Sequence, residues 1–408
     1  MTDLAQPSRD LLVDGDGHVF EPPDLWTARM DAARWGDWIP RREVEDGCYE
    51  INYAGGVVRS GGRELQDAMA AAEGMTPQEF HDMLEGLRIP GGHDPVARLA
   101  DMDAEGIDAA VLYPSQAMFF GPTEPIEAFH DIDFVTDCIR AYNDWIADYC
   151  AAAPQRLFGI AAVPLQSTEH AVAEAERAAD LGLRGVFIRP SAYLKGTDTF
   201  LPLNHAAYDP FWSACQSLGL AVGLHPGVHI DTPGACLLYD LVMPSENMMV
   251  TNMAMSELHG GSALGQAVGN PADMIVTMGR LIMGGVCERF PTLRFVFLES
   301  SGGWVPTQLE RMDEQVKAFP LEKRWLSLLP SEYFRRQCFV SFEPEEWNLA
   351  ACAEWLGTDR VIWASDYPHP EYHPGIVKEL IETIEPLAKP DRARVLGANA
   401  INAYGLPL

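Results

Sequence analysis

The sequence predicts an α/β protein of the (β/α)8 TIM-type barrel class, with insertions after strands 1 and 5. Three observations support this fold. Short apolar runs rich in β-branched residues alternate with amphipathic helical stretches along most of the chain. Eight such runs can be counted, which is the number of parallel strands that closes a barrel. The 408 residues suffice for a single barrel, which we expect to span 11–405.

The expected elements alternate from the N-terminus onward. The first strand is expected over 11–16, where Leu-Leu-Val leads into Asp-Gly-Asp. The other strands are expected over 106–114, 156–164, 185–190, 220–225, 293–299, 338–343 and 360–366. Helices are expected wherever apolar residues recur every three or four positions. These stretches are 94–105, 131–153, 167–181 with Ser167 as its N-cap, 206–218, 272–290, 304–317, 348–356 and 375–388.

Two insertions interrupt this alternation. The first covers 35–92 and contains a small β-hairpin over 48–59, where Gly55 and Gly56 separate two apolar runs. The second covers 227–270, is rich in Met and Gly, and follows the fifth strand. Long loops at that end of a barrel shape an active site or an oligomer contact. The alternative fold is an open doubly wound sheet, but the first strand–helix junction has no Gly-x-Gly-x-x-Gly, which disfavours a nucleotide-binding fold.

Composition and charge exclude several classes of protein. The formal net charge of −30 would repel nucleic acids and anionic membrane surfaces. We expect no signal peptide and no membrane span, because no apolar run approaches roughly 18 residues. The eight cysteines contain no Cys-x-x-Cys pair, which indicates reduced thiols in the cytoplasm rather than a zinc cluster.

Metal-ligating residue types stand at the ends of several expected strands. Asp16 and His18 lie two residues apart after the first apolar run, so their side chains point to one face of a strand. His225 ends the fifth strand and Asp366 ends the eighth. Active sites of barrels lie at the C-terminal ends of the strands, so these residues are expected to converge. Two imidazoles and two carboxylates suit one divalent metal, with Zn²⁺ preferred over Mn²⁺ or Fe²⁺.

Four stretches of the chain resemble a known family. They are Val-Asp-Gly-Asp-Gly-His-Val-Phe-Glu-Pro over 13–22, Gly-Leu-His-Pro-Gly over 223–227, Phe-Leu-Glu-Ser-Ser-Gly-Gly-Trp over 297–304 and Trp-Ala-Ser-Asp-Tyr-Pro-His over 363–369. In these stretches the chain resembles the metal-dependent amidohydrolases of the decarboxylase type, which include aminocarboxymuconate semialdehyde decarboxylase and γ-resorcylate decarboxylase. The resemblance implies a metal held by Asp16, His18, His225 and Asp366.

The chain departs from that family at two positions. The first ligand is His or Glu in the named relatives and is Asp16 here, which we expect to change metal preference rather than abolish binding. The sixth strand ends in a catalytic His in those relatives and in Glu299 here. A glutamate can transfer protons if its surroundings tune its pKa. We favour this role for Glu299, with substrate orientation or a structural ion pair as the alternatives.

Further residues are expected to contact the substrate or to support the site. Dinuclear amidohydrolases commonly carry a bridging Lys or carboxylate on the fourth strand, whereas 186–189 offers none here, so the resemblance implies a single metal. Arg189 at the end of that strand could bind a substrate carboxylate or could pair with an acidic neighbour. The remaining candidates are Glu21, which could orient a site group or hold Arg189, and His229 as a substrate contact. Trp304 could wall the substrate or simply pack in the core, and His369 could support Asp366 or be a loop imidazole held by the backbone.

Three functions fit this pattern. The first is a metal-dependent non-oxidative decarboxylase of a small aromatic or enol-type carboxylic acid, with Glu299 or Asp366 as the proton donor. The second is a hydrolase of an amide, lactone or activated C–C bond, in which Asp366 takes a proton from a metal-bound water. The third is a barrel without catalysis that serves binding or assembly, which the full ligand set disfavours. By resemblance we expect a homodimer or homotetramer, with a small-molecule substrate.

Overall fold

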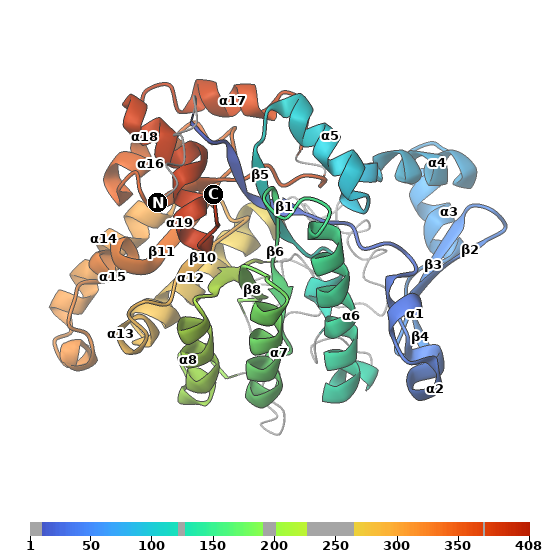
Figure 1. Ribbon diagram of the computed structural model, residues 1–408, viewed down its shortest axis with the longest axis horizontal. Coiled ribbons are helices and arrows are strands. Elements are labelled where there is room, and N and C mark those ends of the chain that lie inside the picture. The colour runs from blue at the N-terminus through green and yellow to red at the C-terminus, as the bar shows by residue number, and fades with distance from the viewer. Residues whose placement is uncertain (1–9, 121–126, 191–200, 227–264, 370–371) are drawn as a thin grey trace, which may run out of the picture.

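A computed structural model describes residues 10–120, 127–190, 201–226, 265–369 and 372–408 of the chain, in a mixed α/β arrangement (Figure 1). The strands are β1 (Val13–His18), β2 (Arg41–Glu45), β3 (Tyr49–Ala54), β4 (Val57–Gly61), β5 (Ala109–Tyr113), β6 (Leu157–Gly159), β7 (Ala161–Ala162), β8 (Gly185–Ile188), β9 (Ala221–Leu224), β10 (Phe295–Phe297), β11 (Cys338–Phe342) and β12 (Val361–Trp363).

Helices fill most of the connections between these strands. The α-helices are α1 (Leu25–Arg29), α2 (Ala32–Trp35), α3 (Arg63–Ala72), α4 (Pro77–Leu87), α5 (Pro95–Glu105), α6 (Ile132–Cys150), α7 (Thr168–Asp180), α8 (Asp209–Leu218), α12 (Asn270–Ile282), α13 (Val286–Arg289), α14 (Val305–Ala318), α15 (Pro330–Gln337), α16 (Leu349–Leu356), α17 (Ile376–Thr383), α18 (Lys389–Ala393) and α19 (Asn399–Tyr404). Short 3-10 or π segments are η1 (Gly36–Trp38), η2 (Pro90–Gly92), η3 (Ala117–Phe119), η4 (Glu127–His130), η5 (Ala206–Tyr208), η6 (Gly265–Gly269), η7 (Glu322–Trp325) and η8 (Arg394–Ala398).

Parallel strands form the centre of the molecule. β1, β5 and β6 pair in one sheet, and β7 to β12 pair in sequence order in another. Only Ile160 separates β6 from β7, and its amide still donates to β5 at 2.9 Å. At the other end, the Asp366 amide donates to the Asp16 carbonyl at 3.0 Å, and the His18 amide donates to the Tyr367 carbonyl at 2.6 Å. The chain that leaves β12 is therefore bonded to β1.

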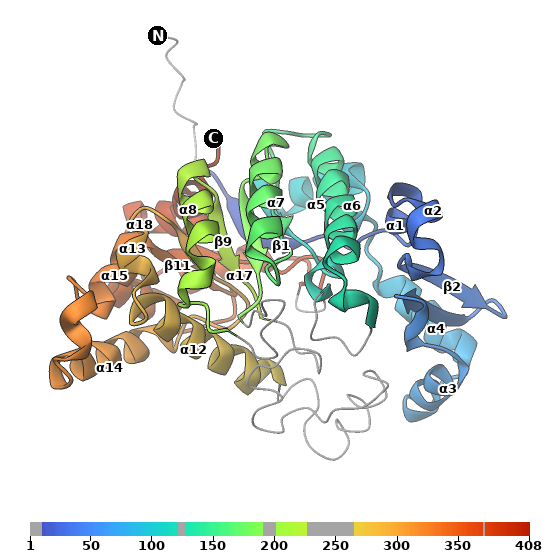
Figure 2. The same ribbon diagram turned by 90° about the horizontal axis from the view of Figure 1, so that it is seen from below.

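The apolar core has two parts because side chains alternate along each strand. In β5, Val111 and Tyr113 join a cluster made mostly of strand residues, the inner cluster, whereas Ala110 and Leu112 belong to a larger cluster that includes helix residues. Helices α6, α7 and α8 of this larger cluster lie side by side (Figures 1 and 2). Tyr404 of the C-terminal helix α19 also belongs to the inner cluster. Its hydroxyl lies 3.0 Å from the Tyr113 hydroxyl, so the last helix contacts the inner cluster at the end of β5.

The structure corrects three expectations about the elements between the strands. The single helix expected over 272–290 is two helices, α12 and α13, because Gly285 takes a φ of +80° that ends regular helix there. The helix expected over 375–388 ends at Thr383, and α18, η8 and α19 follow it. The strand expected over 156–164 is split into β6 and β7.

The first insertion is larger in structure than the expected hairpin. The turn at Gly55 and Gly56 does join β3 to β4, but β2 also pairs with β3, so the sheet has three antiparallel strands. Helices α3 and α4 follow, and these elements lie together at one side of the molecule, on the right of Figure 1. Most of the second expected insertion, residues 227–264, lies outside the described residues.

Two expectations drawn from composition can be compared with the described ranges. No helix within them is long and apolar enough to cross a membrane. Seven of the cysteines fall within these ranges, and all seven are buried free thiols. The prediction of reduced, buried cysteines is confirmed for these residues.

The inner core gives a test of the packing. An added Cβ on Gly223 in β9 would stand 2.2 Å from the hydroxyl of Tyr113, which is fully buried. We expect Gly223→Ala to lower the free energy of unfolding by about 1–3 kcal/mol, measured by urea denaturation. Gly279 in α12 is the matched control, because nothing lies within 4 Å of an added Cβ there. Gly279→Ala should be neutral or stabilising by up to about 1 kcal/mol. Equal stability of the two variants would contradict this packing.

Candidate metal centre

A bulge in β1 determines where its polar side chains point. The register between β1 and β5 shifts by one residue between Asp14 and Gly17. In a regular strand Asp14, Asp16 and His18 would all share one face. With the bulge, the Asp14 carboxylate lies close enough to the Arg98 guanidinium of α5 to be stabilised by its charge. Asp16 and His18 instead approach each other, with 3.7 Å between the Asp16 Oδ1 and His18 Nε2 atoms.

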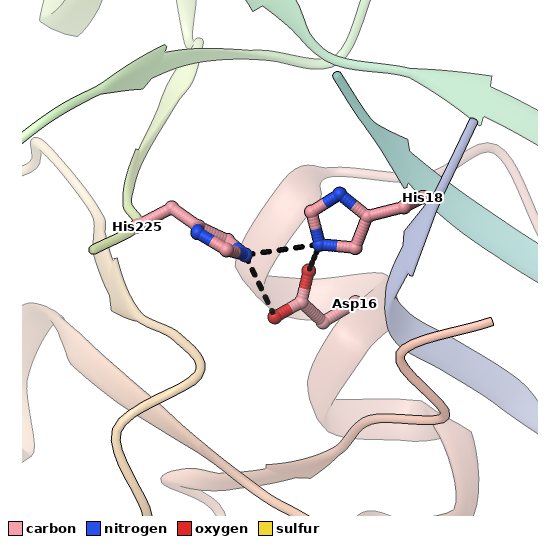
Figure 3. Close-up of side chains that lie close together, drawn as sticks. All are labelled: Asp16, His18 and His225. Carbon is pink, nitrogen blue, oxygen red and sulfur yellow. Dashed lines mark hydrogen bonds and ion pairs between the residues drawn. The ribbon is translucent and has the colours of Figure 1, made fainter. Parts of the chain in front are cut away.

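Backbone carbonyls hold two imidazole rings with their Nε2 atoms toward each other. The Nδ1 of His18 donates to the Pro114 carbonyl at 2.9 Å, and the Nδ1 of His225 donates to the Pro226 carbonyl at 2.8 Å. Each Nδ1 therefore carries the ring proton, and the Nε2 of each neutral ring has a lone pair. The two Nε2 atoms stand 3.0 Å apart (Figure 3). This arrangement places two potential metal-ligand atoms side by side.

Burial keeps both rings neutral. It lowers the pKa of His18 well below the usual range, and the neighbouring His369 and His225 lower it further. Burial also lowers the pKa of His225 to about 3. At neutral pH no proton lies between the two Nε2 atoms, so their lone pairs repel each other. A shared cation turns this repulsion into attraction.

Three carboxylates surround the two imidazole nitrogens. The Asp16 Oδ2 atom lies 3.9 Å from His225 Nε2 (Figure 3), and the Asp366 Oδ1 atom lies 3.3 Å from His18 Nε2. The Glu299 Oε2 atom lies 3.1 Å from His225 Nε2. The structure thus brings together all five residues that the sequence placed at the ends of strands 1, 5, 6 and 8.

The charge of this cluster fits a divalent cation. Burial raises the pKa of Asp16 well above its usual range, and the nearby carboxylates of Asp366, Glu299 and Asp14 raise it further. Within the described part of the chain, the buried Oδ1 of Asp16 has no hydrogen-bond partner. Acidic groups packed this closely without a cation are costly. The nitrogen and oxygen atoms of Asp16, His18 and His225 lie within 4.8 Å of one another, as metal binding requires.

His369 lies beside the cluster and contacts it in two ways. Its Nδ1 is 3.0 Å from the Asp366 Oδ1 atom, and its ring stacks on that of His18 with centroids 4.1 Å apart. On its other side, its Nε2 is 2.9 Å from the Ser115 hydroxyl. His369 is therefore held by side chains and can orient Asp366, which agrees with one of the two roles that its place in the sequence allowed.

Glu21 holds a loop. Its buried carboxylate accepts the backbone N–H groups of Ser115, Gln116 and Ala117 at 2.9–3.2 Å. This anchor fixes the turn after β5, which carries the Ser115 hydroxyl to His369. Of the two roles expected for Glu21, these contacts support the orientation of a site group, through the loop, and not the holding of Arg189. A direct contact with substrate stays a prediction.

The other predicted substrate residues have different placements. Arg189 follows β8 and is near enough to His225 for its charge to help lower the pKa of that imidazole. Trp304 stands just before α14, donates its indole N–H to the Ser300 carbonyl at 3.0 Å, and packs against the main core. His229 lies outside the described residues.

Sequence reasoning missed three residues that support the cluster. Ser115 directly follows the strand-end Pro114, so the rule that found Asp366 could have found it. Arg98 is fully buried and donates to the His18 carbonyl at 2.9 Å, although a lone Arg in an amphipathic helix carries no signal of burial. Asp14 accepts the Ser365 hydroxyl at 2.6 Å and the Ser365 amide at 3.0 Å, which links β1 to the end of β12.

Comparison with known proteins identifies relatives over most of the chain. The model of a family described as "Amidohydrolase" matches residues 14–406. A 2-amino-3-carboxymuconate-6-semialdehyde decarboxylase from Dictyostelium discoideum is 27% identical over 317 residues, which is 77% of this chain and 77% of that protein. A gamma-resorcylate decarboxylase from Rhodococcus jostii is 26% identical over 318 residues, which is 74% of this chain and 85% of that protein.

Solved structures with the same fold are also found. An amidohydrolase from Mycobacterium avium subsp. paratuberculosis superposes with a TM-score of 0.71 at 21% identity, covering 97% of this chain and 99% of that one. A dihydroxybenzoic acid decarboxylase from Polaromonas sp. JS666, with bound manganese and the inhibitor 2-nitroresorcinol, superposes with a TM-score of 0.63 at 21% identity. That match covers 84% of this chain and 94% of the Polaromonas chain.

Removing one carboxylate tests the ligand set. We expect Asp16→Ala to lose most of its bound divalent metal, because the variant keeps the two imidazoles but lacks a buried ligand. Metal content per chain would be measured by mass spectrometry after purification. Asp180→Ala, which removes an exposed carboxylate at the end of α7, should keep full occupancy. Equal occupancy in the two variants would show that Asp16 is not a ligand.

The raised pKa of Asp16 predicts how metal binding depends on pH. In the metal-free protein Asp16 keeps its proton above the pH at which an ordinary Asp loses it. His225, with a pKa of about 3, brings no competing proton at neutral pH. Binding must displace the Asp16 proton, so the affinity should rise by about tenfold per pH unit until that pKa is passed. Chelator competition at several pH values would measure this slope, and a flat response would contradict it.

Proposed function

The chain belongs to the amidohydrolase family, and from this premise we propose that it is a metal-dependent non-oxidative decarboxylase of a small aromatic or enol-type carboxylic acid. The observation that carries the proposal is the convergence of the His18 and His225 lone pairs with the carboxylates of Asp16, Asp366 and Glu299. The decarboxylases among the relatives support this reaction over others that the family's metal sites can perform.

We further propose that the ring of parallel strands is an eight-stranded β/α barrel, with β6 and β7 as one interrupted strand. The bonds between β1 and the chain after β12 support closure, since they join the first strand to the last. The candidate metal centre then lies at the C-terminal ends of the strands, where barrel enzymes carry their sites.

One divalent metal is proposed for this centre, held by Asp16, His18, His225 and Asp366. We favour Zn²⁺, because two imidazoles with carboxylates form a common zinc ligand set. Mn²⁺ and Fe²⁺ accept the same donors, and the Polaromonas relative contains manganese. When bound, the metal would supply the positive charge that holds a substrate carboxylate and an adjacent oxygen.

Glu299 is proposed as the proton donor. In its acid form it gives a proton to the ring carbon that bears the carboxylate, which makes that carbon tetrahedral. The C–C bond to the carboxylate then breaks, its electron pair returns to the ring, and carbon dioxide leaves. The Glu299 side chain is 19% exposed, so it can regain its proton from solvent. The net reaction consumes one proton and releases one carbon dioxide.

Other residues of the chain would orient the substrate and the acid. Arg189, whose charge acts on His225, is proposed to bind the substrate carboxylate through its planar guanidinium. His369 holds the Asp366 carboxylate against His18, so that both stay in place during the reaction. The Asn270 side chain donates to the Glu299 carbonyl at 3.2 Å, which anchors the backbone of the acid.

Hydrolysis is the second candidate, and the position of Asp366 favours it. Its Oδ1 atom lies between His18 and His369, where it could take a proton from an attacking water. The two reactions leave different labels in the product. Decarboxylation in deuterated water places deuterium on the carbon that lost carbon dioxide, whereas hydrolysis in oxygen-18 water places the label in the product.

The proposal also keeps two expectations that bear on the cellular setting. The seven free cysteines in the described ranges support a reducing compartment such as the cytoplasm. Self-association as a homodimer or homotetramer remains a prediction from the resemblance, and light scattering of the purified protein would test it.

Replacing the proposed acid tests the mechanism. We expect Glu299→Gln to lower kcat for carbon dioxide release by about 10²–10⁴-fold, because the amide cannot donate the proton. Metal content should stay at the wild-type level, since Glu299 is not one of the four proposed ligands. The assay would screen hydroxybenzoates and related enol acids with metal-loaded protein.

A matched variant separates loss of the acid from general damage at the site. Glu346→Gln alters a carboxylate that accepts the backbone amide of Gly302 at 3.0 Å, three residues after Glu299. It leaves Glu299 itself unchanged. It should retain far more activity than Glu299→Gln. Full activity of Glu299→Gln would remove Glu299 from the mechanism, and oxygen-18 in the product without carbon dioxide would favour hydrolysis.

A further inference from the structure

A cavity of about 600 Å³ lies between the inserted sheet and the first loops of the parallel strands. Residues of β2 and β3 line one side of it, and residues that follow β1 and β5 line the other. We call it the distal cavity. Its volume is several times that of one benzene ring, so it can hold a substantial part of a small molecule.

The distal cavity adjoins the candidate metal centre through His369. Two of its lining residues, Phe20 and Ser115, contact that imidazole. The Phe20 ring centroid is 5.7 Å from that of His369, and the Ser115 hydroxyl is 2.9 Å from its Nε2 atom. Since His369 also contacts Asp366 and His18, one side chain separates the cavity from the ligand cluster.

Part of the cavity wall is aromatic and fixed in place. Trp26 and Phe120 line it and meet edge to face, with ring centroids 5.1 Å apart. The Trp26 indole donates to the Cys138 carbonyl at 3.1 Å, which fixes its orientation. A rigid wall of this kind favours a flat, apolar group of a ligand.

The rest of the lining carries excess positive charge. Four arginines and two glutamates line the cavity, although the chain as a whole has a net charge of −30. One of the glutamates, Glu21, is occupied by three backbone amides. Positive charge concentrated in a cavity of an otherwise acidic protein attracts anions to that cavity.

Two of the four arginines are neutralised by neighbouring acids, and the other two, Arg41 and Arg59, lie outside that group. Arg42 and Arg88 both pair with Glu50 and Glu85, which makes a group of two cations and two anions. Arg41 stacks on Tyr53 with its guanidinium 4.5 Å from the ring centroid. Among the described residues its acidic partner is the half-exposed Glu43, at 2.7 Å. Because that acidic partner is half-exposed rather than buried, Arg41 can exchange it for an anion in the cavity.

We propose that the distal cavity binds the far end of the substrate, and that this end is an aromatic or apolar arm terminating in an anionic group. The inference rests on the proposed function, in that the near end of the same molecule is the carboxylate held at the metal centre. Trp26 and Phe120 would pack against the arm, and Arg41 would pair with its terminal anion. The preferred substrate is therefore larger than a one-ring hydroxybenzoate.

Three probes separate the parts of this proposal. The first is salicylate, the second is salicylate with a phenyl ring para to the hydroxyl, and the third adds a carboxylate at the far end of that phenyl ring. Binding to the metal-loaded protein would be measured by calorimetry, and carbon dioxide release would be measured in parallel. We expect the third probe to bind about tenfold more tightly than the second, and the second more tightly than salicylate.

A charge variant and a matched control assign the effect to the cavity. Arg41→Gln should weaken binding of the third probe by about tenfold and should change the second by less than about twofold. Arg63→Gln removes the same charge from the same insertion, but Arg63 pairs with Asp46 and does not line the cavity, so it should change neither. Unchanged binding of salicylate in both variants would show that they remain folded.

The outcomes distinguish the distal-cavity proposal from the decarboxylase proposal. No preference for the third probe, no binding of either extended probe, or an equal effect of Arg63→Gln would overturn the assignment of the distal cavity. A preference that depends on Arg41, without carbon dioxide release from any probe, would support the cavity and contradict the decarboxylase function. Carbon dioxide release from salicylate, with no preference for the extended probes, would support the decarboxylase function and contradict the assignment of the distal cavity.

Discussion

The contact between the Nε2 atoms of His18 and His225 is the interaction on which the rest of the site depends. The two atoms are 3.0 Å apart, and both Nδ1 atoms donate to backbone carbonyls. Because burial keeps both rings neutral, neither Nε2 carries a proton that could join them. Such a pair is favourable only around a cation, and the carboxylates of Asp16 and Asp366 lie where they would balance its charge.

Holding these groups in place requires the first and last parallel strands to be joined. Asp14 accepts both the amide and the hydroxyl of Ser365, and the Asp366 amide donates to the Asp16 carbonyl. Two site residues have a strained backbone: the φ values of Glu299 and Asp366 are 41° and 52°. Such conformations cost of the order of 1–3 kcal/mol each and persist only where surrounding bonds impose them. The bonds from Asn270 and His369 provide that support.

Much of this arrangement was accessible from sequence because strand ends and their polar residues are local features. The alternation of apolar runs and helical stretches predicted the positions of the parallel strands, and the residues after them included His225 and Asp366. The prediction of a single helix over 272–290 was wrong, because a positive φ at Gly285 separates α12 from α13. The hydrogen-bond partners of Glu21 could not be predicted from the sequence either, because they are three backbone amides about 95 residues away in the chain.

The sequence by itself determined which residue types could bind a metal and on which strands they would stand, since both follow from local composition and period. Only the tertiary structure decided which way they point. A strict period of two would have put Asp14 on the same face as Asp16 and His18, and the bulge in β1 turned it toward Arg98 instead. That bulge, the tautomers of the two imidazoles and the distal cavity all depend on contacts between segments far apart in the chain. Such contacts form only when the whole fold is assembled, so no local pattern records them.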